Sequence, residues 1–581
     1  MFPATFSTAV PNRCCWASRS SRLARKAGQA AVSRSQLRRQ EASVITGTHN
    51  SVTAIPARAP GTSTPQSSPA AGPRSTICGT HVGVCHLAVA ARRISDDGPI
   101  VKGLVTLVTP DSWHRQGERD GGFMERLGVQ DLAPLRGDDA GWPWDIGAVA
   151  ILDGTGLMDR DGRFRIEAVR RAIEPKLHLV PRFRQLVYRP PLGLGWPLWV
   201  DAPSFDLADH VRVLPLPAGA DQAQLLLACE QLRRRRLDPS RPRWEAWFLP
   251  GLAHRRVGLF VRLHHAMADG VAGVAAFGGL FDLGADPPAP AAPPWTPAPV
   301  PSARELLADN MHRRGHELDR ALSSLADPAG TLRRARRAWP AWREALTEKR
   351  VSRTSLNRPI GPDRTLALVR SRLDLARKIA RAHGATVNDV VLAAVTGGLR
   401  DLLLGRGEPV EDLVLRAIVP ISLHREQPGH ARGNQVGLGM GVPLPIGEPG
   451  HARRLQLITA ETDRRKKNAH PQITSGIFRF ALAQRAFCRL LPHQRYMTMF
   501  VSNVPGPPAP LYLAGAPLLE VFPLIAIAGN MTLGVGVMSY AGQLNLTAVA
   551  DRDGCPDAEV FAGGMRRTLD ELGRSVAAPA A

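Results

Sequence analysis

The stretch that most constrains the fold of this chain is residues 257–270, with the sequence VGLFVRLHHAMADG. Residues 257–263 are apolar except for Arg262, and such a run predicts a buried strand. Two histidines follow, and Asp269-Gly270 then precedes a run of small and apolar residues that predicts a closely packed helix. A strand, a polar loop and a helix in this order hold polar side chains rigidly at the carboxyl end of the strand.

The two adjacent histidines suggest different roles, because neighbouring residues at the end of a strand point to opposite sides. One imidazole can face a cavity and accept a proton, while the other packs and positions the loop. Asp269 is near enough to brace this loop, by a cap-like bond or by an ion pair with an arginine, and Gly270 allows a tight exit. His264, His265 and Asp269 could instead be structural or bind a metal. We expect no metal, because no Glu-x-x-His motif or cysteine cluster accompanies them.

The pattern His264-His265-x-x-x-Asp269-Gly270 resembles the active-site motif of CoA-dependent acyltransferases related to chloramphenicol acetyltransferase and peptide-synthetase condensation domains. Within that superfamily the chain resembles the bacterial wax ester synthase/diacylglycerol acyltransferases. The Asn388-Asp389 pair and the segment Ser-Asn-Val-Pro-Gly-Pro at 502–507 strengthen this resemblance. The likeness extends over about residues 120–573.

The resemblance implies an α/β (α+β) fold with two chloramphenicol-acetyltransferase-like halves. Each half is expected to hold a mixed sheet with flanking helices, and a tunnel is expected between the halves. His265 is implied as general base and His264 as a packing and orienting residue, while Asp269 holds the loop. Acyl-CoA is implied as co-substrate without a bound cofactor, and the acceptor as diacylglycerol or a long-chain alcohol, giving triacylglycerol or wax ester.

Two other classes of function remain open at this stage. A condensation-type enzyme would take acyl groups from the thioester of a carrier protein and acylate a polyketide, peptide or glycolipid hydroxyl with the same histidine chemistry. A non-catalytic protein would bind a lipid surface or nucleic acid without turnover. The intact motif favours an enzyme, and the acceptor is what would separate the acyltransferase classes.

Two further family matches lie in the first half of the chain. Pro197, Leu198 and Trp199 match the Pro-Leu-Trp element of the family, although ordinary core packing also explains Trp199. Arg184 lies in a segment that carries a structural arginine in the family. We predict it as a possible ion-pair partner of Asp269, with a solvated arginine as the alternative.

Two matches lie in the second half. Asn388 and Asp389 open an apolar helix, and Thr386 with Asp389 fits a capping box. A helix cap and a direct role in the active site are therefore both possible for this pair. Ser502 and Asn503 either line the acceptor tunnel or belong to a turn that Pro505 and the following residues fix.

Composition divides the chain into four segments. Residues 1–110 are rich in Ser, Arg and Pro and predict a disordered basic extension, which also resembles a transit peptide superficially. The resemblance implies that residues 111–283 form the first acyltransferase half and residues 362–575 the second. Between them, residues 284–361 predict a proline-rich linker followed by a basic helical crossover. This crossover helix either lies on a membrane surface or packs as an ordinary amphipathic helix.

The net charge of +23 permits anionic partners of several kinds. Because no nucleic-acid-binding module is recognisable, we expect CoA phosphates and anionic lipid headgroups rather than nucleic acid. The seven cysteines form no regular framework, which is typical of a reduced, cytoplasmic protein. The expected location is peripheral, on the inner face of the plasma membrane or on lipid droplets.

Local signals predict several other elements. A short helix is expected at 120–127, a strand at 144–154, and a helix from 166 to 184 that breaks near Pro175 and Pro181. Residues 521–528 and 531–540 predict a hairpin around Gly529-Asn530.

Overall fold

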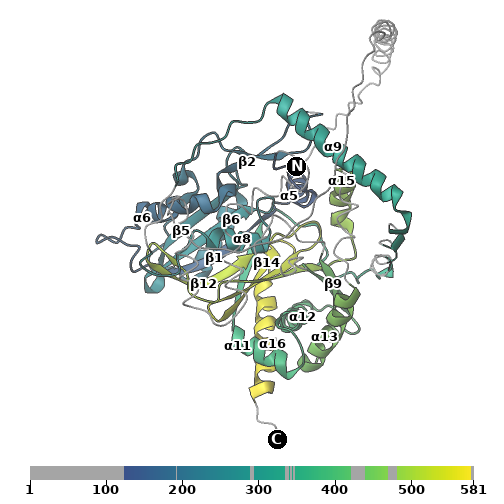
Figure 1. Cartoon of the computed structure of the whole chain (residues 1–581). Helices are drawn as coiled ribbons and strands as arrows, with labels where there is room; N and C mark the ends of the chain where they lie inside the picture. The colour runs from purple at the N-terminus through teal and green to yellow at the C-terminus, as the bar shows by residue number, and fades with distance from the viewer. Residues whose placement is uncertain are drawn as a thin grey trace, which may run out of the picture. The chain divides into compact units, whose positions relative to one another are not determined.

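The computed structural model describes residues 124–420, 439–468 and 481–577, except for residue 192, residues 288–292 and most positions between 331 and 346. The described residues belong to one compact unit that spans Gly79–Ala581. The predicted extension, residues 1–110, lies outside the described part. Two six-stranded sheets with flanking helices make up the fold (Figure 1), which confirms the predicted α/β class with two halves.

The first sheet has the order β11-β12-β1-β6-β5-β4. The predicted buried strand is β6, which pairs antiparallel with β1 and with β5. Every residue of β6 after Arg256 is buried, as expected for a strand that is covered on both faces. The strands of this sheet are β1 (Asp145–Asp153), β4 (Val211–Val213), β5 (Trp244–Leu252), β6 (Arg256–His264), β11 (Tyr512–Leu513) and β12 (Ala516–Leu524).

The second sheet has the order β7-β14-β13-β10-β8-β9. Its central strand β10 runs parallel to both neighbours, β13 and β8, while the remaining pairs are antiparallel. The strands are β7 (Arg364–Arg372), β8 (Val414–Val419), β9 (Met440–Pro445), β10 (Met499–Pro505), β13 (Leu533–Tyr540) and β14 (Gln543–Asp551).

The predicted hairpin between residues 521–528 and 531–540 is wrong. β12 leaves the second half and pairs with β1 of the first sheet, whereas β13 pairs with β14. The hairpin turn is at Ala541-Gly542, where both residues have positive φ, as a tight two-residue turn requires. Asn530 is buried instead, and its side chain bonds with Gln494. A local turn signal could not reveal that β12 crosses to the other sheet.

Helices of the second half pack together on one side of its sheet (Figure 1). The helix α12 (Val387–Gly405) is buried over most of its length and packs mainly against α16 (Ala558–Ala577). The helices α11 (Leu373–Ala382) and α13 (His451–Asn468) complete this group. The group encloses the apolar core of the second half.

In the first half, the described part of the helix predicted at 120–127 is not helical: this holds for residues 124–127, residues 120–123 lie outside the described part, and α5 occupies Val129–Asp139. The predicted break near the two prolines is confirmed, because α6 (Ile166–Ile173) is followed by two short 3-10 helices that begin at Glu174 and Pro181. The other elements are the strands β2 (Gln185–Tyr188) and β3 (Leu198–Asp201) and the helices α7 (Gln222–Arg234), α8 (Gly270–Gly278), α9 (Ala303–Ala326) and α15 (Ala481–Leu490). Within the described residues, no helix combines the length and apolar character needed to cross a membrane.

Candidate active site

The alternation of side chains along β6 decides where the two histidines lie. Leu259, Val261 and Leu263 face a cavity, and His265 continues this face just beyond the end of the strand. Arg262 and His264 occupy the opposite face and are buried. One histidine therefore faces the cavity, and its neighbour lies within the protein.

Both ring nitrogens of His264 have a close polar neighbour. Its Nδ1 accepts the backbone N–H of Ala266 at 3.1 Å. Because Nδ1 accepts, the ring proton is on Nε2, which lies 2.9 Å from Oδ2 of Asp138. This arrangement fixes the orientation of the ring and leaves it no route to a substrate in the cavity.

Asp138 connects the end of α5 to the histidine loop. Its Oδ1 accepts the backbone N–H of Trp144 at 3.2 Å, and its Oδ2 lies 3.3 Å from Nη1 of Arg243. Burial works to raise the pKa of Asp138, but its interaction with His264, the Trp144 N–H and the charge of Arg243 outweigh it and lower the pKa. The carboxylate is therefore ionised at neutral pH.

His265 is positioned through Trp144. Its backbone N–H donates to the carbonyl oxygen of Trp144 at 2.8 Å. The two rings meet edge to face with centroids 6.0 Å apart. Asp138 therefore binds the backbone N–H of Trp144, and the carbonyl oxygen of Trp144 in turn binds the backbone N–H of His265.

Asp269 is the N-cap of α8. Its buried carboxylate accepts the backbone N–H of Ala272 at 2.9 Å, which fixes the start of the helix after the histidine loop. Gly270 does not have a positive φ, so the predicted tight exit does not explain it. A Cβ at Gly270 would lie 3.1 Å from Cγ2 of Val504 on β10, and the glycine therefore allows the two halves to approach closely.

The predicted ion pair between Arg184 and Asp269 is not formed. The guanidinium of Arg184 lies 4.9 Å from the ring centroid of Trp295 and 5.8 Å from that of Phe205. Burial lowers the pKa of Arg184, against the opposing charges of Glu174 and Asp201. Because Trp295 belongs to the proline-rich segment, this contact between distant parts of the chain had no local signal.

The cavity between the two halves has a volume of about 370 Å³. Its walls are almost entirely apolar and come from both sheets and from α5, α8 and α15. Cys488 is on the wall, but burial raises the pKa of its thiol, so it is a poor nucleophile. Residues that face the cavity include His265, Gly270, Phe277, Phe500, Ser502 and Met538.

Ser502 lies on the cavity face of β10, together with Phe500 and Val504, in every second position of the strand. Asn503 is not among the lining residues, because it occupies an intervening position. Of the two residues predicted to line an acceptor tunnel or form a turn, the structure therefore places Ser502 at the cavity.

Pro197, Leu198 and Trp199 lie away from the cavity. Leu198 and Trp199 are buried on β3, and the Arg182 guanidinium lies 4.1 Å from the Trp199 ring centroid. The carbonyl oxygen of Pro197 accepts the N–H of Leu127 at 2.8 Å. These contacts correspond to the core-packing alternative.

Asn388 and Asp389 lie at the start of α12 and do not line the cavity. Thr386 and Asp389 form the capping box, and the buried Oδ1 of Asp389 also accepts the hydroxyl of Thr462 at 2.8 Å. Asp389 therefore stabilises the second half from within.

Sequence reasoning missed Asp138 and the aromatic wall formed by Trp144 and Phe487. Asp138 precedes the strand predicted at 144–154 and Trp144 begins it, but their importance depends on the pairing of β1 with β6, which places Asp145 opposite His264. Among the described residues, no three His, Cys, Asp or Glu side chains are arranged to hold a metal ion.

Comparison with known proteins agrees with this geometry. Residues 127–391 match the model of the wax ester synthase/diacylglycerol acyltransferase catalytic domain, and residues 432–573 match that of the WS/DGAT C-terminal domain. The chain is 31% identical over 451 residues to the probable diacylglycerol O-acyltransferase tgs1 of Mycobacterium tuberculosis, covering 74% of this chain and 90% of that protein. The putative diacylglycerol O-acyltransferase Mb3154c of Mycobacterium bovis matches with the same identity and coverage.

Solved structures share the fold. The wax ester synthase/diacylglycerol acyltransferase from Marinobacter aquaeolei VT8 superposes with a TM-score of 0.55 at 22% identity, covering 78% of this chain and all of that chain. The first condensation domain of the CDA synthetase superposes with a TM-score of 0.50 at 16% identity, covering 78% and 97%. The chain therefore belongs to the wax ester synthase/diacylglycerol acyltransferase family and is an acyltransferase.

Proposed function

We propose that this acyltransferase moves a long-chain acyl group from acyl-CoA to the hydroxyl of diacylglycerol, forming triacylglycerol, and also to long-chain alcohols, forming wax esters. The observation that carries the proposal is the position of His265 on the wall of an apolar cavity lined by both halves. The names of the relatives from Mycobacterium, which are diacylglycerol O-acyltransferases, support diacylglycerol as acceptor.

In the proposed mechanism His265 is the general base. It takes the proton of the acceptor hydroxyl as the oxygen attacks the thioester carbonyl carbon. The C–S bond then breaks, and the CoA thiolate leaves with the proton that His265 returns. Such catalysis typically contributes about 10²- to 10⁴-fold in rate.

The cofactor requirement follows from the chemistry of the thioester. Because a thioester is already activated, the enzyme needs no acyl-enzyme intermediate and no bound cofactor, and acyl-CoA is a co-substrate. Alignment of the two substrates at His265 supplies much of the rate.

The shape and lining of the cavity support lipid substrates. Burial of each methylene stabilises a bound chain by roughly 0.8 kcal/mol, so an apolar wall favours long chains over short ones. Because diacylglycerol resides in membranes and lipid droplets, we also propose that the enzyme works in peripheral contact with such a surface.

The test is acyl transfer by the purified protein from palmitoyl-CoA, with diacylglycerol and hexadecanol offered separately. We expect ester formation with at least one acceptor, and a His265→Ala variant that loses about 10²- to 10⁴-fold in kcat while its unfolding curve is unchanged. Wild-type turnover by this variant would exclude the mechanism. Turnover only with carrier-protein thioesters would instead indicate a condensation-type enzyme.

A further inference from the structure

Among the described residues, the buried side chains of the crossover helix α9 lie in its first turns. Leu306 and Asp309 are buried, and the Asp309 carboxylate pairs with Nε of Arg126 at 2.5 Å and with Nε of Arg313 at 3.2 Å. Beyond Arg313, every side chain of α9 that the structure describes is exposed. In Figure 1 the helix runs along the outside, away from both sheets. The start of the helix packs on the protein, while the described side chains beyond Arg313 face outward.

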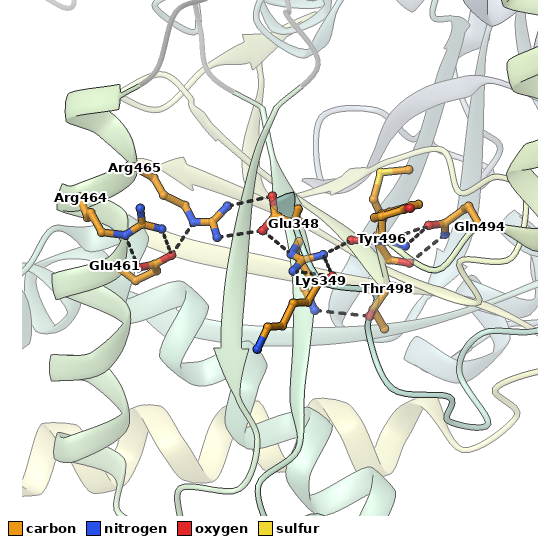
Figure 2. Close-up of polar contacts among 10 residues, drawn as sticks. Glu348, Lys349, Glu461, Arg464, Arg465, Gln494, Tyr496 and Thr498 are labelled. Carbon is orange, nitrogen blue, oxygen red and sulfur yellow. Dashed lines mark hydrogen bonds and ion pairs between the residues drawn. The ribbon is translucent and has the colours of Figure 1, made fainter. Parts of the chain in front are cut away.

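The far end of the crossover is also fixed. Figure 2 shows Glu348 and Lys349 within a polar network of the second half. The Glu348 carboxylate pairs with Arg416 at 3.1 Å and with Arg465 at 2.9 Å. The carbonyl oxygen of Lys349 accepts a further bond from Arg416 at 3.1 Å. Since the crossover is anchored at both ends, its exposed part is held in place although little covers it.

The helix α9 carries a row of large, exposed apolar side chains along its length. At about 100° per residue these positions fall within roughly 60° of the helix circumference, so they form one narrow stripe. Each side chain is at least 48% exposed. Scattered exposed leucines are ordinary, but several aligned on one face of a helix indicate an interaction surface. We call this row the α9 stripe; its members are Leu307, Met311, Leu318, Leu322 and Leu325.

Charge distinguishes between possible partners of the α9 stripe. The same helical spacing places Arg304 and Arg314 on or beside the stripe, while the acidic residues Glu305, Glu317 and Asp319 lie on other faces. In a pair of helices from two copies, these arginines would be buried without a carboxylate partner, which is costly. At a bilayer surface, arginines instead extend to phosphate groups while the apolar residues enter the lipid.

The next stretch of the crossover continues the pattern. Leu332, Arg336, Trp339 and Arg343 follow one another at spacings of four, three and four residues, and all four are exposed. Tryptophan and arginine together are typical of residues at a membrane–water interface. The chemistry therefore matches an anionic phospholipid surface.

We propose that the α9 stripe docks the enzyme on an anionic phospholipid surface. This inference rests on the proposed function in that it identifies the surface from which a lipid acceptor is taken. The anchor of α9 is Arg126, which lies shortly before α5, and α5 contributes Gln130, Ala133 and Pro134 to the cavity wall. Docking through α9 thus joins the lipid surface to the chain segment that leads into the cavity wall.

The test measures binding of the full-length protein to vesicles, without acyl-CoA. Vesicles of phosphatidylcholine alone are compared with vesicles that also contain phosphatidylglycerol. We expect binding that requires phosphatidylglycerol and weakens with salt. The variant Leu318→Ser/Leu322→Ser/Leu325→Ser should partition at least about tenfold more weakly, because the side chains that insert are removed.

The matched control is Leu227→Ser/Leu404→Ser/Val560→Ser, which removes three apolar side chains that are 44–48% exposed on other helices. It should bind vesicles as the wild type does. With detergent-dispersed diacylglycerol, the stripe variant should keep wild-type turnover, whereas turnover of vesicle-embedded diacylglycerol should fall in parallel with binding.

Unchanged vesicle binding by the stripe variant would overturn the proposal, and so would failure of the wild type to bind. A wild-type dimer that the stripe substitutions convert to a monomer, without vesicle binding by either, would assign the surface to a second copy. Because binding is measured without turnover, a failure of the proposed reaction in the His265→Ala experiment would remain distinguishable.

Discussion

At the scale of single residues, the site depends on a division of labour between two adjacent histidines. His264 is buried; its Nδ1 accepts the Ala266 N–H, and its Nε2 lies next to the Asp138 carboxylate. His265 reaches the cavity, and its backbone is held through Trp144. Asp138 contacts both His264 and Trp144, which makes it a positioning residue for the proposed base.

The substitution Asp138→Asn should therefore lower kcat by about tenfold to a hundredfold, with little change in KM for acyl-CoA, because misplacement of a catalytic group weakens its alignment. The amide can still accept the Trp144 N–H but no longer offers a carboxylate oxygen to His264. Steady-state kinetics on the folded variant measure this effect. A parallel rise in KM with unchanged kcat would contradict the positioning role.

The same variant gives a pH test. Because the pKa of folded Asp138 is lowered from 3.8, the ionised carboxylate stabilises the fold above that value, and this stability is lost as pH falls through the lowered pKa. The difference in free energy of unfolding between wild type and Asp138→Asn should thus be constant near neutral pH and shrink below 3.8. Urea titrations at a series of pH values measure it, and a difference that grows with acidity would refute it.

At the scale of elements, helix ends fix the parts of the fold that surround the site. Asp269 caps α8 directly behind the histidine loop, and Thr386 with Asp389 caps α12 in the second half. Both caps have local sequence signals. Asp269 and Thr386 each accept the backbone N–H of the residue three positions further along the chain. The two caps differ in their position relative to the cavity: α8 lines the cavity, whereas the start of α12 does not.

Asp389→Ala should destabilise the protein by about 2–4 kcal/mol, because it removes a cap and leaves the Thr386 and Thr462 groups without their buried acceptor. Specific activity of the folded variant should match the wild type. The control Asp374→Ala removes an exposed carboxylate that pairs with Arg372, and it should change the free energy of unfolding far less than Asp389→Ala does. Denaturant unfolding and activity per folded molecule are measured together; lost activity in a fully folded protein would favour a direct role for Asp389.

At the scale of the whole molecule, the second half contributes a strand to the sheet of the first half. β12 belongs to the second half in sequence but pairs with β1, and its residue Phe522 is fully buried in a cluster that both halves share. Gly536 on β13 permits the crossing, because a Cβ there would lie 2.8 Å from the carbonyl oxygen of Pro523. The cavity lies between the halves, and β12 also forms part of its wall.

Fragments of residues 1–361 and 362–581 should therefore fail to fold separately, since the first leaves β1 with an unpaired buried edge and the second leaves β12 without its sheet. Co-expression should restore a soluble complex with acyl transfer. Circular dichroism and cooperative unfolding of each fragment are the measurements. Cooperative unfolding of fragment 1–361 alone would show that the first half can fold without the pairing of β12 with β1.

The sequence by itself determined the features that depend on neighbours along the chain. The buried strand before the histidines, the cap of α12, the breaks before Pro175 and Pro181, and the family all follow from patterns within a few residues or from motifs. Strand alternation even predicts that His264 and His265 face opposite sides.

Only the tertiary structure decided the features that depend on pairing between distant segments. The contact of His264 with Asp138, the stacking of Arg184 on Trp295 and the crossing of β12 each join residues far apart in sequence. Such contacts are chosen by which surfaces bury together, and no local propensity encodes that choice. For the same reason, the exposure of the α9 stripe could not be predicted from the sequence, because it depends on how the rest of the chain packs.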